Sequence, residues 1–122
     1  MLKKYVLIID HLASSIFPAL EKIKKEYADY ANTELLLITS ESNRQIDQEY
    51  VAQLADILIC DFSNQKTIIE ALSKYKDQIV GVICRGDKQI QYLRRVIPHL
   101  PKDTDSVLIV GDHQIEGDLN IR

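Results

Sequence analysis

Five short apolar runs alternate with segments of helical periodicity along this chain. The runs cover residues 5–9, 35–38, 57–60, 79–83 and 107–110, and none of them alternates polar with apolar side chains. Strands that are apolar throughout are buried on both faces, as in a parallel sheet with helices on both sides. The pattern predicts one α/β domain over residues 1–122, a three-layer α/β/α Rossmann-like fold with a mostly parallel five-stranded sheet.

The segments between the runs have the spacing of amphipathic helices. We expect helices over residues 15–31, from residues 42–45 onward, after Ser63 and after Asp87, where both named side chains are suited to cap the helix that follows. Tyr50 falls on the apolar face of the second helix and is expected in the core. Residues 102–122 hold the last apolar run but no helical stripe, so they are expected to form a linker or a truncated tail.

Charge and the length of the apolar runs exclude two classes of partner. The chain has 15 basic and 18 acidic residues, a formal charge of -3, and no basic run longer than two residues, so a nucleic-acid partner is not expected. A helix needs about 20 apolar residues to cross a bilayer, and no run here approaches that length, so no membrane partner is expected either. These features predict a soluble, cytoplasmic protein.

Cysteine, histidine and glycine usage argues against a cofactor or metal in this chain. Cys60 and Cys84 each close an apolar run without CxxC spacing, which predicts buried thiols. The three histidines form no metal-binding pair. With four glycines in total, the sequence contains neither GxGxxG nor GxxxxGK[ST], so it lacks a phosphate cradle for ATP or a dinucleotide. We therefore predict no metal site, no cofactor and no catalytic residue.

Candidate binding residues follow the apolar strands. Ligands of open parallel sheets bind beyond the carboxyl ends of the strands. Arg85 would place a guanidinium beside a helix N-terminus, with Gly86 allowing the turn, and that combination suits an anion. Alternatively, Arg85 forms a salt bridge to Asp87 or Asp61 and the turn only connects two elements. The candidate substrate- or anion-binding residues are Asp10, His11, Asp61, Arg85, Gly86 and Asp87.

The positions of Asp10 and Asp61 invite comparison with a phosphoacceptor receiver domain. A receiver needs two acids after its first strand, a hydroxyl residue after its fourth and a lysine after its fifth. The corresponding positions hold Asp10–His11, Cys84–Arg85 and Gly111–Asp112. We therefore do not expect phosphorylation of Asp61. A degenerate receiver-like, flavodoxin-like domain that acts through protein interaction is kept as the alternative function.

Three segments carry a resemblance to a known family. Residues 55–63 read ADILICDFS, residues 83–90 read ICRGDKQI and residues 96–101 read VIPHLP. Together they resemble the N-terminal, pre-ATP-grasp domain of ATP-grasp ligases, and the similarity spans roughly Lys4 to Pro101. Enzymes of that family join a carboxylate to an amine or thiol through an acyl-phosphate. Their ATP and Mg²⁺ are bound by later lobes that this chain does not include.

The resemblance implies a substrate-side role. The chain would be non-catalytic by itself, and its partners would be the ATP-grasp lobes of a longer parent chain and a small-molecule carboxylate substrate. Arg85, Gly86 and Asp87 would then face the cleft shared with those lobes.

Overall fold

A computed structural model of the protein describes residues 3–26, 30–40, 46–110 and 114–117. The strands are β1 (Tyr5–Ile9), β2 (Glu34–Thr39), β3 (Leu54–Ile59), β4 (Ile79–Arg85), β5 (Asp105–Val110) and β6 (Gln114–Gly117). The α-helices are α1 (Phe17–Glu26), α2 (Gln48–Gln53), α3 (Gln65–Leu72) and α4 (Asp87–Val96). Short 3-10 helices are η1 (Ser14–Ile16), η3 (Lys76–Gln78) and η4 (Ile97–His99).

The strands form one six-stranded sheet in the order β3-β2-β1-β4-β5-β6. The first five strands of this order are parallel, and β6 is antiparallel to β5. The predicted α/β class and its five parallel strands are confirmed. The sixth strand falls inside the segment for which the sequence indicates only a linker or tail.

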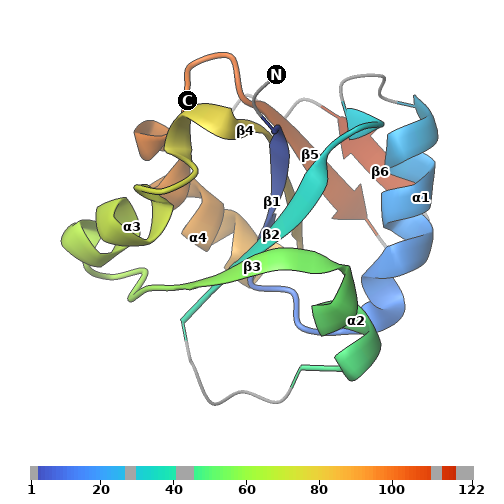
Figure 1. The fold of residues 1–122 in the computed structure, drawn as a ribbon, viewed down its shortest axis with the longest axis horizontal. Coiled ribbons are helices and arrows are strands. Elements are labelled where there is room, and N and C mark those ends of the chain that lie inside the picture. Colours follow the sequence, from blue (N-terminus) through green and yellow to red (C-terminus); the bar gives the residue numbers. More distant parts are fainter. Residues whose placement is uncertain (1–2, 27–29, 41–45, 111–113, 118–122) are drawn as a thin grey trace.

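Helices cover both faces of the sheet, which confirms the three-layer arrangement (Figure 1). Leu20 and Ile23 of α1 pack on one face together with Ile16 of η1 and Tyr50 of α2. The β1 residues Val6 and Ile8 lie in the same core. The other face carries α3 and α4. The alternate β1 residues Tyr5, Leu7 and Ile9 lie in that second core with Ile68, Leu72, Leu93 and Val96. Each buried strand therefore serves two cores, which is why its apolar residues are continuous.

Two predicted helix starts differ from the structure. The N-cap of α4 is Gly86, with φ 92°, and Asp87 is the first helical residue rather than its cap. The N-cap of α3 is Asn64, whose side chain accepts a 3.1 Å bond from the Lys66 amide. A glycine suits the first position because φ is positive there. The predicted start of the second helix, at residues 42–45, lies outside the described residues.

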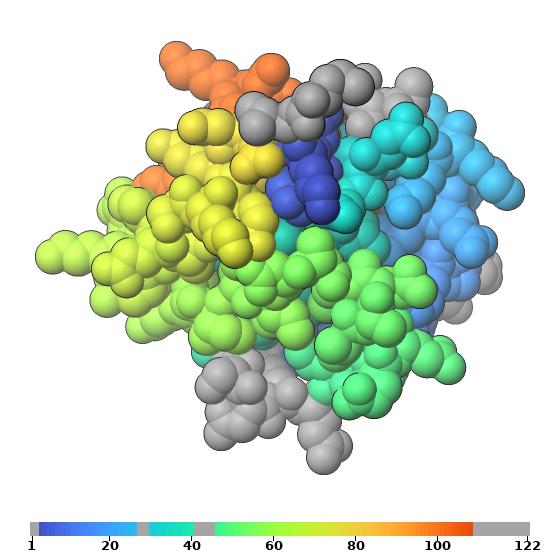
Figure 2. Space-filling model, in the orientation of Figure 1, coloured from blue at the N-terminus to red at the C-terminus, as the bar shows by residue number. Residues whose placement is uncertain are grey.

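The strand β3 forms one edge of the sheet. Figure 2 shows this edge at the surface, in green, between α2 and α3. Ile59 at its end is 42 % exposed. The opposite side of the parallel sheet is continued by β6. Within the described residues, no helix is long and apolar enough to cross a membrane.

Candidate functional site

The strand order places the turn after β1 next to the turn after β4. Ile8 lies opposite Ile83 in the parallel pairing of the two strands. Asp10 and Arg85 each follow two residues later, so they leave the sheet side by side. The chain runs from β1 outward through β2 to β3, then crosses back to β4 on the other side of β1. In open α/β sheets, ligands bind at the carboxyl ends of the strands on either side of such a reversal of direction, and we call this region of the chain the crevice of β1 and β4.

Asp10 is the buried centre of this crevice. Its side chain is only 4 % exposed, and a carboxylate oxygen accepts a 2.7 Å hydrogen bond from the hydroxyl of Thr39. Its amide donates to the Ile38 carbonyl at 2.8 Å, which ties the turn to β2. The backbone has φ 44°, a left-handed conformation that is strained for a residue other than glycine. The turn is held by its neighbours in a conformation that local preference disfavours.

Gly86 and Gln89 connect α4 to the turn after β1. The Gln89 side-chain amide donates to the Asp10 carbonyl at 3.3 Å. A Cβ on Gly86 would lie 2.9 Å from the Gln89 side-chain oxygen, so glycine leaves room for this contact as well as allowing φ 92°. Gln89 stands three residues after the N-cap, the position that glutamine or glutamate takes in a capping box. This spacing is a signal that can be read from the sequence. Gln89 is nevertheless not among the predicted site residues.

His11 carries a polar atom that is buried without a partner. Its Nε2 has no hydrogen bond among the described residues. Burial lowers the pKa of His11, and the positive charge of Arg85 lowers it further, against smaller opposing effects of a backbone hydrogen bond with Ala13 and of the charge of Asp10. The imidazole is therefore neutral at pH 7, because its ordinary value is already 6.5. The parallel register of β1 and β4 places the turn that carries His11 beside the turn that follows Arg85.

Tyr50 is a second buried residue with an unpartnered polar atom, in the core beneath α1 and α2. Its side chain is fully buried, packs edge-on against Phe17 at 5.8 Å, and its hydroxyl has no hydrogen-bond partner among the described residues. Burial raises the pKa of Tyr50, and the charge of Asp10 adds to the shift. The expectation that Tyr50 belongs to the core is confirmed. Its unpartnered hydroxyl could not be read from the apolar periodicity.

A polar contact links α2 to the turn after β1. The Asp47 carboxylate accepts hydrogen bonds from the amide and the hydroxyl of Ser14, at 3.2 and 3.1 Å. Ser14 opens η1 and Asp47 precedes α2. The contact ties the start of α2 to η1.

The structure does not bring Asp61 to this crevice. Asp61 follows β3, with β2 standing between that strand and β1. Its exposed carboxylate accepts bonds from the Ser63 amide at 2.9 Å and the Ser63 hydroxyl at 2.6 Å, and these bonds lower its pKa. Asp61 shapes the turn into α3. Asp87 lies on the exposed first turn of α4.

The two cysteines are buried free thiols, as predicted. Burial raises the pKa of each to about 11, with a further contribution from Asp61 and Asp10 at Cys60. Both are therefore protonated at pH 7 and unsuited to nucleophilic attack. Within the described residues, no cluster of three or more histidine, cysteine or acidic side chains could hold a metal ion.

Comparisons with known proteins add no family. No protein-family model matches the chain, and no curated protein matches it. One solved structure that it matches is a glucose-6-phosphate 1-dehydrogenase from Mycobacterium avium, with 9% sequence identity and a TM-score of 0.35 over 88% of this chain and 35% of that chain. The chain thus spans about a third of that dehydrogenase. A likeness at this level carries no argument about function.

Proposed function

We propose that this chain is the substrate-side domain of an ATP-grasp type ligase, one that joins a carboxylate to an amine or thiol. The observation that carries the proposal is the register of β1 and β4, which brings the strand ends at Asp10–His11 and at Arg85 side by side. A permanently charged guanidinium there, beside the N-terminus of α4, favours a carboxylate or phosphate group. The resemblance of residues 83–90 and 96–101 to the pre-ATP-grasp domain then names the class of enzyme.

Each residue of the crevice has a distinct role in this proposal. Arg85 holds the anionic group of the substrate, and Gly86 lets that group approach the backbone of the first α4 turn. The buried Nε2 of His11 is available for a polar group of the substrate, since it has no partner among the described residues. Asp10 stabilises the turn that carries His11 and is not expected to contact the substrate.

The residues of this chain do not fit ATP or Mg²⁺. The sequence has no glycine-rich phosphate cradle, and the described residues contain no acidic cluster suited to the metal. We therefore assign ATP and Mg²⁺ to later lobes of a longer parent chain. The chain itself is non-catalytic on this proposal. An ATP-dependent ligase draws on the ATP of the cytoplasm, so the proposal also implies a cytoplasmic location.

The receiver-like alternative is less well supported by the strand order. Flavodoxin-like sheets, including receivers, have the order 2-1-3-4-5, whereas Rossmann-type sheets have the order 3-2-1-4-5. The parallel strands of this chain follow the second order. The crevice therefore lies between β1 and β4 instead of between β1 and β3.

The test combines the parent gene with one substitution. We expect the reading frame beyond codon 122 to encode ATP-grasp lobes, and the full-length enzyme to release ADP when given a carboxylate with an amine or thiol. Arg85→Ala should lower kcat/KM about tenfold or more, the loss of one charge-assisted contact, at a stability cost below about 1 kcal/mol. Arg94→Ala, an exposed arginine on α4, is the matched control and should change neither quantity.

Two results would overturn the proposal. A stop codon or an effector domain in place of the ATP-grasp lobes would contradict the assignment of the parent protein to the ligases. A large loss of stability in Arg85→Ala with kcat/KM intact would instead assign Arg85 to a structural salt bridge.

A further inference from the structure

A pocket lies between α3 and the end of α4, away from the crevice of β1 and β4. Its volume is about 320 Å³, which is enough for a small organic molecule. We call it the α3–α4 groove. Residues before and within α3 line one side, and residues at the end of α4 and in η4 line the other; they include Phe62, Ser63, Gln65, Ile68, Arg95 and His99.

The ionisable groups that line the α3–α4 groove are basic. They are Arg95 and His99, and none of the described residues that line the pocket is acidic. Within the described residues, neither of the two forms a salt bridge. The whole chain carries a formal charge of -3, so this local excess of basic groups runs against its composition. Such a pocket is complementary to an anion.

The first turn of α3 adds a backbone donor. The amides of Asn64, Lys66 and Thr67 are already bonded to Asp61 or to Asn64 itself. The amide of Gln65 has no acceptor among the described residues, and the Gln65 side chain lines the pocket. An N–H at the first position of a helix points toward an incoming anion and gains from the helix dipole.

The nearest acid on the α3 side is already engaged. The Asp61 carboxylate accepts both the amide and the hydroxyl of Ser63, at 2.9 and 2.6 Å. Ser63 therefore lines the groove without a hydrogen to donate. The donors left for a ligand come from Gln65, Arg95 and His99.

The floor of the α3–α4 groove is apolar and firmly packed. Phe62 is 4 % exposed and stacks on Tyr92, with ring centroids 4.1 Å apart and planes 9° from parallel. Ile68 beside it is almost fully buried. Pro98, which also lines the groove, is exposed, so a small apolar body can lie against it while the charged end of the ligand meets the basic side.

We propose that the α3–α4 groove is a second binding site, for a small organic phosphate monoester. A guanidinium, an imidazole and a backbone amide offer three donors from different directions, and a phosphate presents three acceptor oxygens where a carboxylate has two. The apolar part of the ester lies against Pro98. The site is independent of the proposed ligase function, because it uses no residue of the β1 and β4 crevice.

Phenyl phosphate is the probe that tests this site. We titrate it into the ¹⁵N-labelled chain and follow ¹H–¹⁵N spectra, with inorganic phosphate and benzoate in separate titrations. Saturable shifts are expected at the Gln65 amide, and binding of phenyl phosphate should be at least about threefold tighter than that of either smaller probe. Arg95→Gln should weaken binding about fivefold or more.

Two further comparisons of variants separate the contribution of the Arg95 guanidinium from that of the Gln65 backbone amide. Arg94→Gln removes the same charge one residue away, outside the pocket, and should change the affinity less than about twofold. Gln65→Pro removes the backbone N–H at a position where proline is tolerated, because Gln65 opens α3 and Asn64 is extended. It should weaken binding more than Gln65→Ala, which keeps that N–H.

The proposal fails on any of three results. Equal weakening by Arg94→Gln and Arg95→Gln would mean unspecific attraction of anions to the surface. Equal affinity for phenyl phosphate and for inorganic phosphate or benzoate would contradict the organic phosphate. The absence of saturable shifts up to about 20 mM phenyl phosphate would exclude the site.

Discussion

Asp10 combines two features that are costly for a single residue. Its carboxylate is buried and its backbone is left-handed. Buried carboxylates persist when hydrogen-bonded, and strained backbones persist when their surroundings fix them. Thr39 supplies the hydroxyl and β2 accepts the Asp10 amide. Residues arranged in this way are more often found where a fold holds a site than where it only packs.

The contact between Thr39 and Asp10 is testable by isosteric replacement. Thr39→Val keeps the shape but removes the donor, so we expect a loss of about 1–3 kcal/mol in the free energy of unfolding. Thr39→Ser keeps the donor and removes one methyl group, for a loss of about 1 kcal/mol. Urea denaturation of the three proteins measures both. A valine variant as stable as the unchanged protein would contradict the role of the hydroxyl.

The pKa of His11 gives the stability of the chain a defined dependence on pH. Because burial and Arg85 lower that pKa below 6.5 in the folded state, the unfolded chain binds the proton more readily. The stabilising contribution is complete above 6.5 and is lost as the pH falls through 6.5 toward the folded value. NMR titration of the His11 ring should therefore give a midpoint below 6.5.

Removing the neighbouring charge tests the cause of that shift. In Arg85→Gln the His11 midpoint should rise, and in Arg94→Gln it should stay where it is. A His11 midpoint at or above 6.5 in the unchanged protein would contradict the arrangement.

At the scale of elements, the apolar runs predicted the strands well and the helix boundaries less well. The predicted range 5–9 is β1 itself, and the other four runs each fall on a parallel strand. Leu54 fits the helical spacing of α2 but begins β3, because α2 passes into the strand without a loop. The strand β6 was missed, since residues 114–117 read QIEG, with neither a continuous apolar run nor a helical stripe. Its place depends on pairing with β5, which local sequence does not encode.

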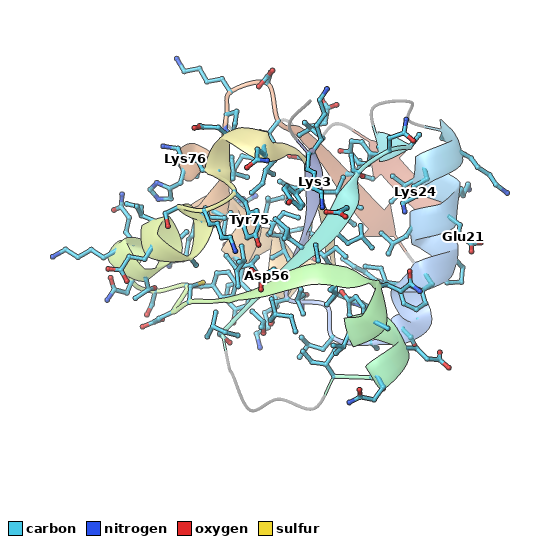
Figure 3. All side chains as sticks on the ribbon, in the orientation of Figure 1. Lys3, Glu21, Lys24, Asp56, Tyr75 and Lys76 are labelled. Atoms are coloured by element: carbon cyan, nitrogen blue, oxygen red, sulfur yellow. The ribbon has the colours of Figure 1, made fainter. Side chains whose placement is uncertain are left out.

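A tyrosine that lies outside the sheet forms a hydrogen bond with the edge strand β3. The Tyr75 hydroxyl donates to the Asp56 carboxylate at 2.7 Å, and the ring meets Tyr5 edge-on at 4.8 Å. Figure 3 shows Tyr75 and Asp56 directed toward one another across the sheet edge. The chain between α3 and η3 is thereby joined to the middle of β3. An edge strand gains from such a contact because it lacks a neighbour on one side.

Tyr75→Phe tests this attachment. The variant keeps the ring and loses the hydroxyl, so we expect a loss of about 1 kcal/mol, together with faster hydrogen exchange in β3. Tyr92→Phe is the matched control, because the Tyr92 hydroxyl has no hydrogen bond within the described part of the chain. Equal melting temperatures for the two variants would show that the Asp56 contact adds nothing.

For the whole molecule, strand order decides which candidate residues meet, and strand order is not readable from the apolar pattern. Asp10, His11 and Arg85 were singled out as strand-end residues, and the order of the sheet brings them together while leaving Asp61 aside. Thr39 adds to this group through its hydrogen bond to Asp10. Its place at the end of an apolar strand marks it as a strand-end residue, but the sequence does not show that its hydroxyl faces Asp10 after folding.

The folded chain should not depend on a metal. Both cores are built from its own apolar side chains, one on each face of the sheet. We expect thermal melts with and without EDTA to agree within about 2 °C. A fall of more than about 5 °C on chelation, on the order of 1 kcal/mol for a domain of this size, would contradict this expectation.

The pairing of β1 with β4 also has a kinetic consequence. These two neighbours are separated in sequence by β2, β3 and the helices between them, so their contact closes the longest loop within the parallel part of the sheet. Closing such a loop costs conformational entropy before the strand contacts form and offset that cost. Strand pairs that are distant in sequence therefore form slowly during folding. The crevice has one wall from each half of the chain. A nascent or half-folded molecule therefore cannot hold a ligand there, and occupancy of the crevice reports that the two halves have joined.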